Sequence, residues 1–320
     1  MKADRIRALV DERWPDLPVA STQQLATAGL EDRLLTAAVR SGTVLRLRRG
    51  AYVRSSYWQG LKPWNRDSLL IHAHHLSTGG LALYSHLSAA RLHEYQVWNV
   101  GPLIHVTTTY ANSGKSAGMD VRTHRAFLGE QDVATLRTPD GREITVTNLE
   151  RTVLDCARIL PLEQAAVIGD HALRKGADPG ELRRRLEQGP EKRGSRRARL
   201  LLDALDGRSE SAGETRTRLL LNSFGMKGFI PQVGIPTRSG LFRADFADTG
   251  ARIIIEFDGA AKYTDYRPAE EVLLAERRRE NALIEEGWSV FRLEWKHLDR
   301  PAELKRRLQA MAERRGGVSA

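Results

Sequence analysis

Residues 241–258 read LFRADFADTGARIIIEFD, and this stretch predicts two neighbouring β-strands joined by a tight turn. The DTGA segment at 248–251 suits a two-residue hairpin loop with glycine in its second position. If the first and last residues of that segment pair, Asp245 lies opposite Ile254. Glu256 follows two residues later on the same face, because side chains alternate with a period of two. We therefore expect Asp245 and Glu256 to be diagonal neighbours whose side chains converge.

The sequence around this pair predicts an α/β unit in the order helix, three strands, helix, strand, helix. The expected elements are a helix at 211–224, strands at 232–235, 241–247 and 252–258, a helix at 269–286, a strand at 288–292 and a helix from 301 onward. Burying Glu256 behind three isoleucines without a partner would cost several kcal/mol, so we expect a cation or a basic group beside it. Carboxylates from two strands suit Mg²⁺ or Mn²⁺, which take few protein carboxylates together with waters and a substrate phosphate.

The residues of this unit resemble the PD-(D/E)XK nuclease superfamily, in particular its very-short-patch-repair-like branch. The resemblance is carried by Glu214, Gln232, Asp245, the EFDG segment at 256–259, Lys262 and the pair Gly287-Trp288. It implies a catalytic set of Glu214, Asp245, Glu256, Asp258 and Lys262, in which Asp245, Glu256 and Glu214 hold the metal. Asp258 stands where the superfamily usually has lysine, so the role of that lysine passes to Lys262 or is absent. Related proteins of this branch also carry an E-x-D-G segment.

Two other interpretations of the acids stay open. Asp245 and Glu256 could form salt bridges with nearby arginines, for which the candidates are Arg243, Arg252 and Arg292. A nuclease fold could also be degenerate and serve only to bind DNA.

Residues 1–60 predict three helices followed by a β-hairpin, which is the order of a winged helix-turn-helix. The helices are expected at 2–14, from Ser21 to Gly29, and at 31–40, and the hairpin at 44–53. Ser21 and Gln24 have the spacing of a capping box, which starts the second helix. In this fold the third helix enters the major groove of DNA.

The charge of the chain favours a polyanionic partner. Fifty Lys and Arg against forty Asp and Glu give a net charge of +10, and nucleic acid is a common partner for such a surplus. Residues 40–54 contain five arginines and no acid. We expect contacts to double-stranded DNA from Arg33, Arg40, Arg46, Arg48, Arg49 and Tyr52. The alternative is a solvated strand edge that the charges protect from aggregation.

The same region resembles the AbiEi-type antitoxin and transcriptional-regulator family. The residues that carry the resemblance are TQQL at 22–25, Gly29 and RLRRGAY at 46–52. In that family the winged helix binds operator DNA and the following α/β domain has the antitoxin function. The resemblance implies a bacterial defence or toxin–antitoxin setting, with a cognate toxin or defence protein as a second partner.

We therefore expect a multi-domain α/β protein. Its parts are a winged helix at 1–60, an AbiEi-like α+β domain at 61–190, a basic linker at 191–208 and the nuclease-like domain at 209–320. No apolar run is long enough to span a membrane. A single cysteine, Cys156, and a charged start without a signal-peptide pattern favour the cytoplasm. The oligomeric state stays open.

The favoured function is that of a DNA-binding protein with a metal-dependent endodeoxyribonuclease domain. The alternatives are a non-enzymatic antitoxin-like repressor with an inactive nuclease fold, and cleavage of RNA. Histidines in the middle segment could in principle bind metal, namely His72 and His75 with His86 or His93. Because no cysteine or HExxH spacing accompanies them, a half-solvated helix face is the favoured interpretation.

Overall fold

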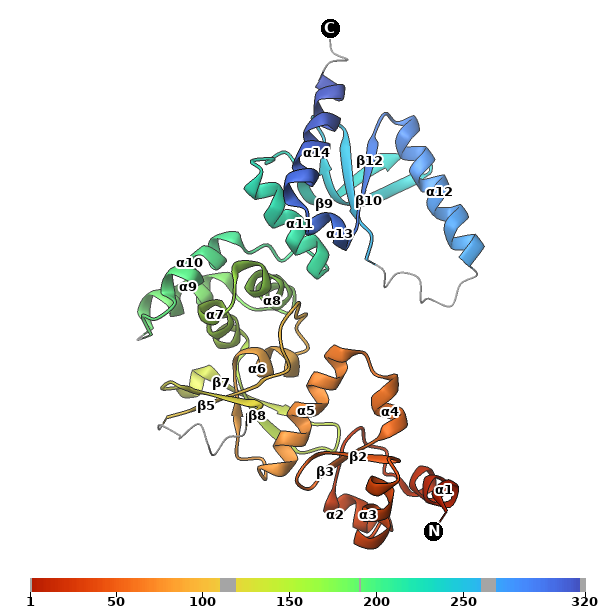
Figure 1. Ribbon diagram of the computed structural model, residues 1–320. Helices are drawn as coiled ribbons and strands as arrows, with labels where there is room; N and C mark the ends of the chain where they lie inside the picture. Colours follow the sequence, from red (N-terminus) through yellow and green to blue (C-terminus); the bar gives the residue numbers. More distant parts are fainter. Residues whose placement is uncertain (1, 110–118, 190, 260–268, 317–320) are drawn as a thin grey trace. The chain divides into compact units, whose positions relative to one another are not determined.

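The computed structural model describes residues 2–109, 119–189, 191–259 and 269–316 (Figure 1). The chain is a mixed α/β protein with three sheets, as the sequence predicts in general terms. It divides into two compact units, residues 1–159 and 160–320. None of the helices within the described ranges is long and apolar enough to cross a membrane.

The first unit begins with three helices and a small sheet of strand order β1-β3-β2. These elements are α1 (Ala3–Arg13), β1 (Ala20–Ser21), α2 (Thr22–Thr27), α3 (Asp32–Arg40), β2 (Val44–Arg48) and β3 (Ala51–Arg54). The predicted capping box is confirmed, because Ser21 and Gln24 exchange side-chain-to-backbone hydrogen bonds of 3.2 and 2.8 Å. The strand β1 is not among the predicted elements, since two residues are too few to show an alternating pattern. Buried side chains such as Val10, Leu25 and Leu35 join the helices in one core.

A five-stranded sheet of order β6-β5-β4-β8-β7 completes the first unit. Its strands are β4 (Leu83–Tyr84), β5 (Ile104–Thr108), β6 (Val121–Arg125), β7 (Val133–Arg137) and β8 (Glu143–Thr147). The helices of this part are α4 (Ser55–Gly60), α5 (Pro63–Ser77), α6 (His86–Leu92), the short 3-10 helix η1 (Glu130–Asp132) and α7 (Leu149–Ile159). The pairs β5–β6 and β4–β8 are parallel, and the others are antiparallel.

The second unit starts with four helices, α8 (Leu162–Arg174), α9 (Pro179–Gln188), α10 (Ser195–Ala204) and α11 (Ala212–Ser223). The division between the units therefore precedes the predicted boundary at residue 190, and most of the segment predicted as a basic linker forms α10. A helix forms there because Ala198, Leu201 and Leu202 give α10 a buried apolar side. A buried ion pair of 2.6 Å between Arg218 and Asp170 connects α11 to α8.

The remainder of the second unit is a four-stranded sheet of order β12-β11-β10-β9 with helices on both faces (Figure 1). Its elements are β9 (Ile230–Thr237), β10 (Gly240–Asp248), β11 (Ile253–Phe257), α12 (Ala269–Glu285), β12 (Ser289–Leu293), α13 (Trp295–Leu298) and α14 (Pro301–Gly316). The predicted order of elements is confirmed, with the short α13 added. Strands β11 and β12 are parallel, whereas β9, β10 and β11 form an antiparallel meander. Phe246 and Ile255 face the core under α11 and α14, and Ile254 faces the core under α12.

Candidate functional site

The turn between β10 and β11 differs from the predicted two-residue loop. Asp248 lies opposite Ile253, so the turn contains the four residues 249–252. The Asp248 carboxylate accepts the N–H of Ala251 at 2.9 Å, and Arg252 has a φ of 51°. These two local features close the turn before Ala251 can pair with Asp248, because a left-handed residue does not continue a strand. The predicted register is therefore wrong by two residues.

Extended by one position beyond its last pair, the corrected register places Asp245 opposite Glu256 instead of on its diagonal. The recorded pairs Phe246–Ile255 and Ala247–Ile254 fix this alignment. Because side chains alternate every two residues, a shift of two keeps both acids on the same face. Glu256 lies between two residues of the α14-side core and therefore points to the opposite face, which α12 covers.

Each of the two acids is bonded to the backbone of the opposite strand. The Asp245 Oδ2 atom accepts the N–H of Phe257 at 2.8 Å, and the Glu256 Oε1 atom accepts the N–H of Asp245 at 3.3 Å. The regular backbone pairing of β10 with β11 ends one position earlier, at Phe246 and Ile255. The carboxylates thus replace carbonyl groups where the two strands separate, which holds both acids at one point of the sheet.

Two further side chains, Gln232 and Glu214, lie near Asp245 and Glu256. These four residues are called the acidic row. The register of β9 with β10 places Gln232 level with Asp245, and Gln232 has a left-handed φ of 56°. Its amide donates a 2.9 Å hydrogen bond to Glu214, a buried residue at the start of α11. Glu214 also accepts the N–H of Glu210 at 2.8 Å. Burial raises the pKa of Glu214, and the negative charge of Asp245 raises this pKa further.

The remaining residues of the predicted catalytic set are Asp258 and Lys262, of which the structure describes only Asp258. Asp258 follows directly after β11, is half-buried, and donates its N–H to the carbonyl of Leu293 at 2.7 Å. Lys262 lies outside the described residues.

The arginines considered as salt-bridge partners for the acids contact other groups. Arg243 bonds Glu210 at 2.8 Å, and Arg292 bonds Glu280 at 3.0 Å. Arg252 donates to the carbonyl of Glu286 at 2.9 Å. These contacts give each arginine a partner on another segment, and Arg292 lies level with Glu256 on the neighbouring strand.

The chemistry of this row fits a hard divalent cation. Carboxylate and amide oxygens are the donors that Mg²⁺ prefers. Among the residues that the structure describes, however, the three metal-compatible side chains whose ligand atoms lie within 4.8 Å of one another are histidines of the first unit. Glu214, Asp245 and Glu256, which the structure describes, do not form such a group of three, so the structure does not bring the predicted metal ligands to one point.

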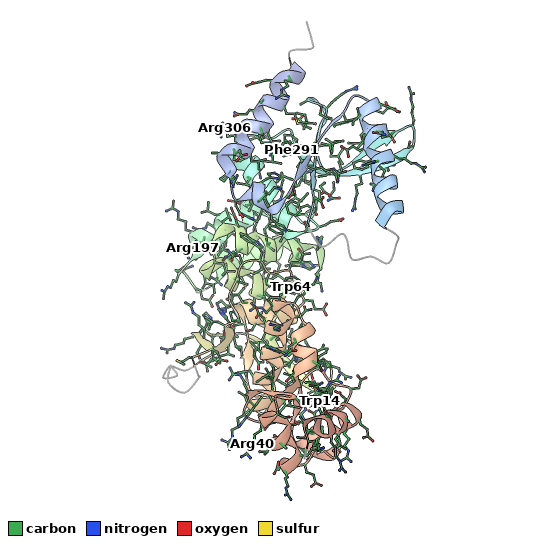
Figure 2. All side chains as sticks on the ribbon, turned by 45° about the vertical axis from the view of Figure 1, so that its right-hand side comes forward. Trp14, Arg40, Trp64, Arg197, Phe291 and Arg306 are labelled. Carbon is green, nitrogen blue, oxygen red and sulfur yellow. The ribbon has the colours of Figure 1, made fainter. Side chains whose placement is uncertain are left out.

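In the first unit, α3 exposes a polar face that contains two of the predicted DNA contacts. Arg33, Thr36 and Arg40 are exposed and lie on one side of the helix, where they line a shallow depression (Arg40 in Figure 2). Arg46 and Arg49 are also exposed and belong to the β2–β3 hairpin. These four arginines are thus available to a partner in solution.

The other two predicted DNA contacts are engaged within the unit. Arg48 forms an ion pair with Asp120, and its side chain is only 17% exposed. Tyr52 packs against the core of the three helices. Because Asp120 is distant from Arg48 in the sequence, no local pattern could indicate this pairing.

The sequence missed one cluster of side chains altogether. His86 lies together with His105 and His124, not with His72 and His75. A signal was present, since β5 and β6 each carry a histidine within a short β-type segment. Their pairing depends on the parallel register of β5 and β6, which the sequence does not show.

A family model described as "Transcriptional regulator, AbiEi antitoxin" matches residues 16–55. The matched segment contains α2, α3 and the β2–β3 hairpin, so the predicted resemblance of the N-terminal region is confirmed. Among solved structures, the chain is similar to the crystal structure of the RV2827C protein from Mycobacterium tuberculosis, with a TM-score of 0.41 and 16% identity. That similarity covers 67% of this chain and 79% of the other. No curated protein matches the chain.

Proposed function

We propose that the chain binds double-stranded DNA with its N-terminal helices and hairpin, and hydrolyses phosphodiester bonds at Asp245 and Glu256. The order of α1 to β3, with strand order β1-β3-β2, supports a winged helix-turn-helix fold. In that fold α3 enters the major groove and the hairpin contacts the backbone. The match of residues 16–55 to a regulator and antitoxin family supports DNA as the partner. A cognate toxin is the second partner that this family suggests.

The order of elements in residues 209–320 supports a PD-(D/E)XK-type nuclease fold. The single observation that carries the enzymatic part is that the Asp245 and Glu256 carboxylates each bond the backbone of the other strand at the point where the regular pairing of β10 with β11 ends. Two acids that face each other where paired strands separate can bind one ion and one phosphate together.

In this proposal Asp245 and Glu256 hold Mg²⁺ or Mn²⁺. Such an ion lowers the pKa of a bound water and polarises the phosphodiester. The backbone N–H of Phe257 fixes the orientation of Asp245, and Gln232 fixes that of Glu214. The raised pKa of Glu214 suits a group that gives or takes a proton closer to neutral pH.

The test is cleavage of plasmid and duplex oligonucleotides by the full chain with Mg²⁺ or Mn²⁺. We expect Asp245→Asn and Glu256→Gln to lower the cleavage rate at least about 100-fold while DNA affinity stays unchanged. Glu187→Gln is the matched control, because Glu187 is an exposed acid on α9 of the same unit. Cleavage that persists in both site variants would refute the proposal, and preferential cutting of RNA would reassign the substrate.

The alternative function is a repressor that binds operator DNA without cutting it. The mutual backbone contacts of Asp245 and Glu256, and Asp258 in place of the usual lysine, favour this alternative. Sequence-specific binding without cleavage under any divalent metal would support it.

A further inference from the structure

Three histidines from separate elements of the first unit meet beside the five-stranded sheet. His105 is on β5, His124 is on the neighbouring strand β6, and His86 is the first residue of α6, just after β4. His86 and His105 are buried, and His124 is half-buried. His86 has a φ of 48°, a conformation that costs energy for a residue with a side chain and is typical of functional positions.

The ring nitrogens of these histidines are close enough to share one ion. The His105 Nδ1 and His124 Nε2 atoms are 2.9 Å apart, and one nitrogen from each of the three rings lies within 4.8 Å of the others. Zinc bonded to nitrogen at about 2.0–2.1 Å in a tetrahedron separates its ligand atoms by about 3.4 Å. We propose that His86, His105 and His124 form a binding site for a divalent transition-metal ion, and that zinc is the ion that this donor set fits.

Binding requires the stacked rings of His86 and His124 to rotate relative to each other. The His86 and His124 rings are stacked with centroids 3.6 Å apart and planes 16° apart. Because each lone pair lies in the plane of its ring, one of these two rings must turn for both nitrogens to point at the same ion. The Cβ–Cγ bond of histidine has a broad rotational energy profile, which is the movement that this rearrangement uses.

The surroundings of His86 are those of a metal ligand. Its Nδ1 is 2.9 Å from the Ser85 hydroxyl, which accepts a hydrogen bond from Thr107 at 2.7 Å. The same nitrogen is 3.9 Å from Oδ2 of Asp155, a buried carboxylate. A ligating histidine commonly uses its second nitrogen in this way, which fixes the ring and makes it a stronger donor. We assign Nε2 of His86 as the ligand atom for this reason.

Burial favours neutral imidazoles, the form that binds metal, whereas the positive charges nearby oppose the charge of an ion. Burial lowers the pKa of His105 to about 3 and that of His124 to about 4, with neighbouring positive groups acting in the same direction. Burial lowers the pKa of His86 as well, and Arg151 and Arg158 add to this shift. These two arginines bond Asp155, and Asp155 is the anion in position to offset part of the charge of an ion.

The class of ion follows from the donors. Three imidazoles select zinc, cobalt, nickel or copper over Mg²⁺ and Ca²⁺, which prefer oxygen. Three protein ligands leave one position for water or a small anion, as in catalytic zinc sites. Because the site is separate from Asp245 and Glu256, it does not depend on the proposed nuclease activity.

The test uses the full chain after treatment with a chelator, in a Glu256→Gln background that weakens the acidic row. We expect it to bind one Co²⁺ per chain with visible absorption of nitrogen-bound cobalt, and Zn²⁺ to displace that cobalt. Zinc at a hundred times its Kd should raise the Tm of the first unit by about 5–10 °C.

His124→Ala should weaken Co²⁺ binding at least about 100-fold. His124 is chosen because it is only half-buried, whereas alanine at the buried His86 or His105 could prevent folding. His72→Ala is the matched control, because His72 lies on α5 outside the cluster, and it should bind like the parent. Absence of stoichiometric binding by the parent chain, or unchanged binding by His124→Ala, would overturn the proposal. Cleavage is measured separately on the wild-type chain. If the wild-type chain does not cut DNA while the Glu256→Gln chain binds Co²⁺, only the nuclease proposal is refuted and the metal site stands.

Discussion

The salt dependence of DNA binding tests the N-terminal interface most directly. The perturbation is the double variant Arg40→Ala/Arg46→Ala, which removes one exposed arginine from α3 and one from β2. Arg5→Ala is the control, since Arg5 is equally exposed but lies on α1, away from the groove-facing elements of a winged helix.

The magnitude follows from the number of phosphate contacts. Each neutralised phosphate changes the slope of log K against log[salt] by about −0.9 in duplex DNA. Four exposed arginines (Arg33, Arg40, Arg46 and Arg49) therefore contribute a slope of about −3.6, or a loss of about 150-fold in affinity between 50 and 200 mM salt. Removing two of them should make the slope shallower by about 1.8. The loss of affinity between 50 and 200 mM salt should then be about 12-fold smaller than in wild type.

The assay is fluorescence anisotropy of a labelled duplex titrated with the full chain at several KCl concentrations, without divalent metal. The double variant should bind more weakly than wild type at 50 mM salt and approach it as the salt rises. Arg5→Ala should keep the wild-type slope. An unchanged slope in the double variant, or an equal change in Arg5→Ala, would show that DNA does not contact this face.

Three further predictions concern the stability of the two units. Leu25→Ala removes a fully buried side chain from the first core and should lower the free energy of unfolding by about 2–5 kcal/mol in urea. Asp170→Asn leaves the buried Arg218 without its charge partner and should cost about 3–5 kcal/mol, seen as a lower urea midpoint for the second unit. Burial lowers the pKa of His74, which bonds Tyr84, to about 4, with Arg48 adding to the shift. His74 is therefore neutral when folded, and its stabilisation, complete above pH 6.5, is lost as the pH falls toward 4. Between pH 7 and pH 4, the free energy of unfolding of wild type should therefore fall by about 3 kcal/mol more than that of His74→Gln, as measured by denaturation curves. Parallel pH profiles of the two proteins would contradict this.

Local patterns in the sequence predict much of the fold because their causes are local. Ser21 and Gln24 form a capping box through contacts three residues apart, and the order of helices and strands in residues 209–320 follows from alternating and helical periodicity. The helix α10 escapes prediction because its many basic residues obscure three buried apolar positions. The pairing of Arg48 with Asp120 and the histidine cluster escape it because both join distant segments through the tertiary structure.

The prediction for Asp245 and Glu256 tolerates an error of two residues in the register of β10 with β11, but not an error of one. The turn between β10 and β11 contains four residues where two were expected, yet Asp245 and Glu256 still share a face. A shift of one residue would have sent one carboxylate into the core beside Phe246 or Ile255, whereas a shift of two changes only the neighbour. For Glu256 the neighbouring Ile255 and Phe257 enforce this outcome, because an odd shift would bury a charge and expose apolar side chains. The shared face of the two acids therefore depends on the alternation of the strands, and their direct opposition depends on the turn that Asp248 and Arg252 close.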